Sequence, residues 1–192
     1  MIDLLPDLDG AELDLEQLFG RSAPLEVDLG CGDGSFLQAL AAEHPDRNFL
    51  GIERLLHRVR SSHRKALDLP NVRVIRSETF FILRHLLPAR SVDVFYLLFP
   101  DPWPKRRHHR RRLVNSEFFS AICRCLTNNG SLFIATDHDD YFAAIGNLLQ
   151  NTPQFAATNR GWPLPSTTFE KRFRAVGLPI HRLELRKISP VT

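Results

Sequence analysis

The sequence predicts an α/β fold in which a mostly parallel sheet is covered by helices on both faces. Short apolar segments alternate along the chain with segments whose apolar residues recur at helical spacing. The run Val92–Phe99 is apolar over most of its length, as expected of a buried strand. Acidic residues stand at or just after five of the predicted strands, at the edge where such sheets bind their ligands.

The length of 192 residues predicts one domain, residues 1–192, that opens with a short helical segment within about residues 1–22. The expected strands are 25–29, 47–53, 72–76, 92–99, 131–137 and 180–186. The expected helices are 35–42, 55–67, 80–87, 115–126, 141–149 and 169–176. Residues 128–130 are expected to be the turn that ends helix 115–126, and 150–160 a polar loop.

Charge and cysteine content exclude several classes of protein. The net charge is only +3, but the segment Lys105–Arg112 holds six of the 25 Lys and Arg residues, which favours an anionic partner. Three cysteines without a CxxC pair predict neither a disulfide framework nor a zinc site. The acidic, proline-containing start predicts that there is no signal peptide, and the lack of a long apolar run predicts that there is no membrane segment. We therefore expect a cytoplasmic protein, and the cysteine pattern predicts that it holds no metal.

The segment 98–112 is the most informative stretch of the sequence. Pro100 and Pro102 end the strand before it and hold Asp101, Trp103 and Lys105 on a stiff loop. A rigid acid, a flat ring and a block of positive charge suit a nucleic-acid base attached to phosphates. The alternatives are a solvated basic loop and a tryptophan packed within it.

A glycine-rich turn follows the first predicted strand. Gly30, Gly32 and Gly34 permit close approach of a ligand to the backbone, although any tight strand–helix turn favours glycine. Asp28 and Asp33 would repel the pyrophosphate of NAD, whereas the sulfonium and ammonium groups of S-adenosylmethionine would be attracted.

The next two strands also end near acidic residues. Glu53 is placed to accept hydrogen bonds from both ribose hydroxyls of the cofactor. Glu78 either reaches the adenine edge or begins the following helix. Ordinary solvent-facing acids remain the alternative for this whole set.

The chain resembles the bacterial tRNA (guanine-N7)-methyltransferase family from about Leu25 to Arg186. The most specific match is Phe99–Lys105 with Arg107, His108 and the arginines 110–112; further matches are Asp28–Gly32, Gly51–Glu53, Ala135–Asp137 and Thr167–Glu170. The resemblance implies a Rossmann-like class I methyltransferase fold, with a seven-stranded sheet whose last strand is antiparallel. Asp28, Glu78 and His138 stand where the family more often has Glu, Asp and Trp.

The resemblance also implies an activity and its residues. The activity would be methylation of a variable-loop guanine of tRNA by S-adenosylmethionine. The cofactor would be held by Asp28, Gly30, Gly32, Gly34, Glu53, Glu78 and Asp101, and the substrate by Lys105, Asp137, Thr167, Thr168, Phe169 and Glu170. Contacts to tRNA phosphates are expected from Arg106, Arg107, Arg110, Arg111 and Arg112. We expect a monomer or a homodimer.

The chemistry agrees with these residue types. Nitrogen 7 of guanine carries a free lone pair and needs no strong base, so alignment supplies much of the rate. Asp101 is the candidate catalytic residue, because a carboxylate stabilises the positive charge that develops on the base. Asp137 is the first candidate for the Watson–Crick edge of guanine.

Several alternatives remain open. Thr167-x-x-Glu170 is also a helix-capping sequence, and Asp139 and Asp140 are better placed than Asp137 to cap the helix before Tyr141. Two other functions are methyl transfer to a different substrate and RNA binding without catalysis. A third, NAD-dependent oxidation, is disfavoured by the acidic glycine turn and by the lack of a Tyr/Lys pair for hydride transfer.

Overall fold

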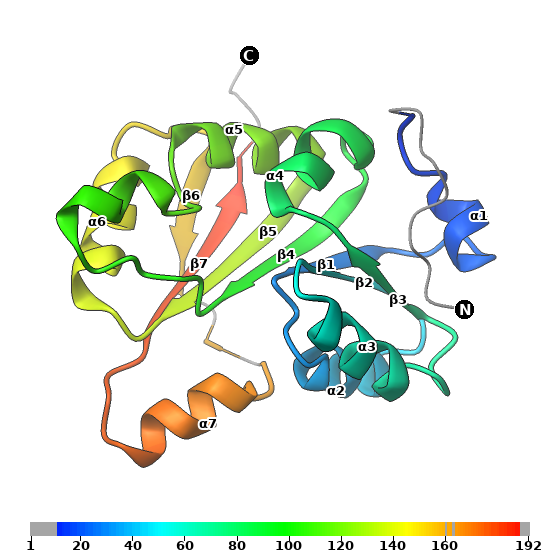
Figure 1. Ribbon diagram of the computed structural model, residues 1–192. Coiled ribbons are helices and arrows are strands. Elements are labelled where there is room, and N and C mark those ends of the chain that lie inside the picture. The colour runs from blue at the N-terminus through cyan, green and yellow to red at the C-terminus, as the bar shows by residue number, and fades with distance from the viewer. Residues whose placement is uncertain (1–10, 160, 163, 189–192) are drawn as a thin grey trace.

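A computed structural model describes residues 11–159, 161–162 and 164–188, and its strands form one seven-stranded sheet of order β3-β2-β1-β4-β5-β7-β6 (Figure 1). The strands are β1 (Leu25–Leu29), β2 (Asn48–Glu53), β3 (Val72–Arg76), β4 (Val92–Leu98), β5 (Leu126–Thr136), β6 (Phe155–Thr158) and β7 (His181–Lys187). Strands β1 to β5 pair in parallel, and β7 runs antiparallel to both of its neighbours. The predicted fold class is confirmed, including the antiparallel last strand.

Helices cover both faces of the sheet. They are α1 (Leu15–Phe19), α2 (Ser35–Glu43), α3 (Leu56–Lys65), α4 (Thr79–Phe81) with the π-helix η1 (Ile82–Leu86), the 3₁₀-helix η2 (Arg106–Arg111), α5 (Ser116–Cys125), α6 (Asp139–Leu149) and α7 (Thr168–Ala175). In Figure 1, α2, α3 and α7 lie below the sheet, whereas α4 and α5 lie above it. No helix among the described residues is long and apolar enough to cross a membrane.

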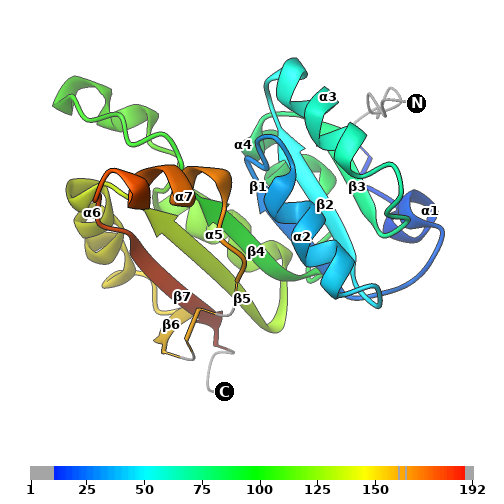
Figure 2. The same cartoon turned by 90° about the horizontal axis from the view of Figure 1, so that it is seen from below.

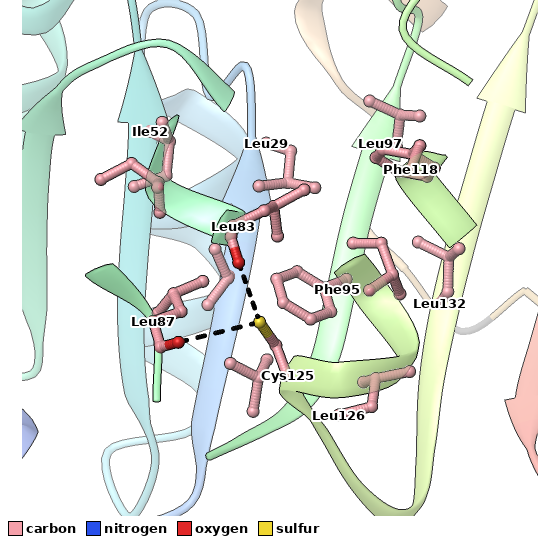
Figure 3. Packing of buried hydrophobic residues seen from close by; sticks show 14 of the residues in the cluster. Leu29, Ile52, Leu83, Leu87, Phe95, Leu97, Phe118, Cys125, Leu126 and Leu132 are labelled. Carbon is pink, nitrogen blue, oxygen red and sulfur yellow. Dashed lines mark hydrogen bonds between the residues drawn. The ribbon is translucent and has the colours of Figure 1, made fainter. Parts of the chain in front are cut away.

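Two hydrophobic clusters lie on opposite faces of the sheet. The larger one joins the sheet to α5, α6 and η1; Figure 3 shows Phe95 near its centre. The Cys125 thiol donates to the carbonyl oxygen of Leu83 at 3.4 Å, so this cysteine is a buried packing residue and not a reactive one. The smaller cluster packs α2 and Val59 of α3 on the other face.

The structure corrects three local predictions. Residues 128–130 lie within β5, where the pairing with β4 slips between Val92 and Val94, so they form an irregularity in the strand and not a turn before it. Strand β6 occupies part of the expected polar loop; its short segment FAAT lacks the β-branched run by which strands are recognised. Helix α6 is capped by His138, whose Nδ1 accepts from the Tyr141 amide at 3.3 Å, and not by Asp139 or Asp140.

Candidate active site

The glycine turn after β1 has an unusual backbone conformation and borders a cavity. Gly30 and Gly32 have φ values of 90° and 57°, which side-chain-bearing residues rarely adopt. The amides of Gly30 and Cys31 both donate to the Ile52 carbonyl oxygen at the end of β2. The turn is thereby fixed to the neighbouring strand, and its residues line a cavity at the carboxyl edge of the sheet.

Gly34 has a packing role in the structure. A Cβ atom at this position would lie 2.7 Å from the Cα atom of Ser62, so glycine is needed for the close approach of α2 and α3. Gly34 is not among the residues that line the cavity, so the structure shows its packing role, and its contact with the cofactor stays a prediction.

Asp28 supplies the buried charge of the site. It is only 3% exposed, lies on β1 and faces the cavity. Burial, together with the charge of Glu53, raises the pKa of Asp28 to about 7. A buried carboxyl group without a compensating positive charge is costly, and a cationic ligand would remove that cost.

Asp33, in the same turn, is already compensated. Burial alone would raise its pKa, but hydrogen bonds from Lys65 Nζ, at 2.6 Å, and from Ser35 outweigh this effect and hold the pKa below its usual value. Asp33 therefore fixes the turn to α3, while Asp28 is the acid left for a ligand.

Glu53 and Glu78 lie in contrasting environments. Glu53 is buried at the end of β2, and its carboxylate accepts from the amides of Gly32 and Leu55 at 3.2 and 2.8 Å. Glu78 is exposed, lies 3.5 Å from the Arg54 guanidinium and makes no side-chain capping bond to α4. The structure brings Glu53 next to the glycine turn but leaves Glu78 at the surface.

The start of α7 closes the cavity from the opposite side. Thr167, Thr168 and Phe169 line it together with the glycine turn, and Figure 2 shows α7 as a separate helix at this edge of the sheet. Thr167 Oγ1 accepts from the Glu170 amide at 2.9 Å, so the predicted cap is present. The Arg58 guanidinium of α3 lies 5.8 Å from the centre of the Phe169 ring, which links α7 to α3.

Glu170 is held inside the fold. It is 3% exposed, and its carboxylate pairs with Arg174 and Arg182. In the structure this carboxylate fixes α7 to β7, and the contact of Glu170 with the substrate stays a prediction. Thr168 and Phe169 remain available to a ligand.

The proline-framed loop meets α7. Phe99 and Trp103 have φ values of 57° and 44°, so the chain bends sharply on either side of Asp101. Phe99 packs 5.4 Å from Phe173 of α7, between ring centres. Two motifs that are far apart in the sequence thus share one site, with Asp101 exposed between them.

Arg112 holds the base of this loop. It is 7% exposed, donates to the Pro102 carbonyl oxygen at 2.8 Å and to Asp140 at 2.5 Å, and lies over the Tyr141 ring. The guanidinium of Arg112 already has these partners in the structure, and its contact with phosphate stays a prediction. Sequence alone does not distinguish it from Arg110 and Arg111.

The other cations of the block remain at the surface. Lys105, Arg106, Arg107, Arg110 and Arg111 are exposed, on and just before η2. The Arg111 guanidinium covers the Trp103 ring at 4.9 Å, so this tryptophan is packed within the segment. Asp137 is half-buried directly after β5. No cluster of metal-ligating side chains occurs in the described part of the chain.

Comparison with known proteins places the chain in a family. Residues 22–183 match the protein-family model described as "Putative methyltransferase". The tRNA (guanine-N(7)-)-methyltransferase of Leifsonia xyli is 40% identical over 95% of this chain and 84% of its own length. That of Halorhodospira halophila is 37% identical over 91% and 79%. The chain belongs to the tRNA (guanine-N7)-methyltransferase family.

Solved structures with low sequence identity share the fold of this family member. The 16S rRNA methyltransferase KamB has a TM-score of 0.65 at 18% identity, covering 93% of this chain and 95% of that one. The 16S rRNA (adenine(1408)-N(1))-methyltransferase from Catenulisporales acidiphilia has a TM-score of 0.65 at 16% identity, over 100% and 96%. These likenesses support the fold class alone.

Proposed function

We propose that this chain transfers a methyl group from S-adenosylmethionine to ring nitrogen 7 of a guanine in the variable loop of tRNA, forming 7-methylguanosine. The observation that supports this most directly is the packing of Phe99 on Phe173, which holds the Asp101 loop against α7, the helix whose first residues line the same cavity as Asp28. Membership of the family supplies the identity of the reaction. The tRNA substrate places the reaction in the cytoplasm, and a single chain supplies every group the proposal uses.

The residues present fit S-adenosylmethionine. Asp28 is a buried acid that makes no ion pair with the residues the structure describes, and the ligand carries both an ammonium and a sulfonium group. Glu53 lies beside the glycine turn, where its oxygens would accept ribose hydroxyls. The bound cofactor supplies an activated methyl group.

The site must open for the cofactor to bind. The cavity between the glycine turn and α7 has a volume of about 40 Å³. Sites for ligands of drug size typically have roughly 300–1,000 Å³. We therefore propose that residues 167–169 move away from the turn during binding and close again over the cofactor, excluding water from the reacting groups.

The predicted acids and cations would have different roles, the acids at the guanine and the cations at the tRNA phosphates. Asp101 would face the guanine and stabilise the positive charge that methylation creates on its ring. Asp137 would accept the N–H groups of the Watson–Crick edge. Lys105 and the four exposed arginines of η2 would contact phosphates, which position the tRNA without reading its sequence.

The decisive experiment is methyl transfer from labelled S-adenosylmethionine to unmodified tRNA transcripts, followed by nucleoside analysis. We expect label in 7-methylguanosine. Label in another nucleoside would support S-adenosylmethionine as the methyl donor but contradict the proposed roles of Asp101 and Asp137. Binding of tRNA by folded protein without any transfer would contradict the proposed enzyme and favour an RNA-binding protein.

A further inference from the structure

A second cavity lies beside the basic helix, away from the cofactor site. It has a volume of about 480 Å³ and lies between η2, the start of α5 and α6. In Figure 1 these elements lie together on the left of the molecule. We name it the α6 groove, and its lining includes Arg110, Val114, Asn115, Asn147 and Asn151.

The chemistry of the α6 groove is that of a nucleoside site. Ala144 and Leu148 are half-buried and, packed beside the buried Val114, provide the apolar surface on which a base or ribose can pack. Asn147 and Asn151 are four residues apart and exposed, so both amides can donate and accept hydrogen bonds.

The charge of the groove also favours RNA. Arg110 is exposed at the groove and makes no ion pair with the described residues. The residues that line the groove include no Asp or Glu. The nearby Asp140 is already paired with Arg112, so it does not oppose an anion. A nucleotide whose phosphate contacts Arg110 and whose base or ribose contacts the two asparagines would use both the positive charge and the amide groups of this surface.

We infer that the α6 groove binds a nucleotide of the tRNA other than the guanine that is methylated. This inference rests on the proposed function. The groove is also connected to the site, because Arg112 lines it and donates to the Pro102 carbonyl oxygen beside Asp101. A nucleotide held there would fix the tRNA against the segment that carries the catalytic residue.

The test compares substitutions in the groove with a matched control that is close in the chain, at the end of α6. The double variant Asn147→Ala/Asn151→Ala removes the amides from exposed positions, and Gln150→Ala changes an exposed neighbour that does not line the groove. Binding of tRNA to the full chain is measured by fluorescence anisotropy over a range of salt concentrations. Loss of two hydrogen bonds should weaken binding about 10-fold, without changing the salt dependence.

Arg110→Ala provides the contrasting result. It should weaken tRNA binding and lower the slope of log K against log salt by about one, since one phosphate contact is lost. The asparagine variant should raise KM for tRNA and leave kcat and the Kd of S-adenosylmethionine unchanged. Gln150→Ala should match the wild type in every measurement.

The outcomes separate this inference from the proposed function. Equal tRNA affinity of the asparagine variant and the wild type, with both folded, would overturn the inference and leave methyl transfer intact. A flattened salt dependence in the asparagine variant would also contradict it, because neutral amides release no counterions. If the asparagine variant binds tRNA more weakly but the wild type forms no 7-methylguanosine, the groove binds RNA as inferred and the proposed reaction is refuted.

Discussion

Replacing Asp28 with asparagine should stabilise the free protein at neutral pH while abolishing its use of the cofactor. Burial and Glu53 raise the pKa of Asp28 from 3.8 to about 7. In the unfolded chain the group ionises near its ordinary value, so ionisation favours the unfolded state over this interval. The stability that protonated Asp28 provides is fully present below pH 4 and is lost as the pH rises through about 7.

The magnitude follows from the pKa difference. One pKa unit corresponds to about 1.4 kcal/mol, so ionised Asp28 lowers the free energy of unfolding by about 4 kcal/mol above pH 7 and by less than half of that at pH 5. Asparagine keeps the shape of the side chain and removes the charge. The stability advantage of the variant should therefore grow by about 2–3 kcal/mol between pH 5 and pH 8.

Urea unfolding at pH 5 and pH 8 measures this difference, with Glu78→Gln as a control that removes an exposed carboxylate. Binding of S-adenosylmethionine, followed by calorimetry, should strengthen in the wild type as the pH rises through 7 and be weak at every pH in Asp28→Asn. If the difference in free energy of unfolding between Asp28→Asn and the wild type does not change with pH, the raised pKa of Asp28 in the folded protein is refuted. Full cofactor affinity in the variant would refute its role as the partner of the cation.

Four further predictions concern the rest of the site. Asp101→Asn should lower kcat for tRNA methylation strongly and leave tRNA affinity near that of the wild type; unchanged turnover would exclude a catalytic role. Thr167→Ala should destabilise the protein by about 1 kcal/mol through loss of the α7 cap and raise the Kd of S-adenosylmethionine, whereas Ser166→Ala, at an exposed neighbour, should do neither. Phe169→Ala should speed cofactor dissociation in stopped-flow measurements, because α7 closes less tightly over the cavity; an unchanged off-rate would contradict the proposed movement of residues 167–169. Arg112→Ala should lower the Tm and kcat but leave the salt dependence of tRNA binding intact, in contrast to Arg110→Ala; a flatter salt dependence would restore Arg112 to the phosphate contacts.

The sequence predicted the elements that repeat a simple pattern. Strands β1 and β3 begin and end at the predicted residues, because five-residue segments rich in apolar side chains are bounded by proline, glycine or polar residues. The π-helix at Ile82–Leu86 was predicted only as a helix, since an i to i+5 pattern leaves no separate signature in the apolar spacing. Strand β6 was missed because it pairs only with β7 at the sheet edge, where tertiary context decides.

The sequence indicated many of the residues at the candidate site but not the structural role of each one. The glycine turn and the acid on β1, predicted from their places at a strand end, line one cavity with the Thr167 motif, which was predicted from the family resemblance alone. Sequence reasoning missed Cys31, Phe36 and Leu98, which complete the lining, because apolar residues there resemble ordinary core. It also assigned Gly34, Glu170 and Arg112 to ligands, although each one holds neighbouring elements together.

These three residues explain how the site is held in place. Gly34 lets α2 approach α3, Glu170 fixes α7 to β7 through Arg182, and Arg112 joins the Asp101 loop to α6 through Asp140. Each residue is tied to an element that borders the cavity or carries Asp101. A ligand-binding residue and the residue that holds it can have the same chemistry, since a carboxylate or guanidinium serves both purposes. Burial separates them in the structure: Glu170 and Arg112 are 3% and 7% exposed, whereas Asp101 and Arg110, which we propose to contact the tRNA, lie at the surface.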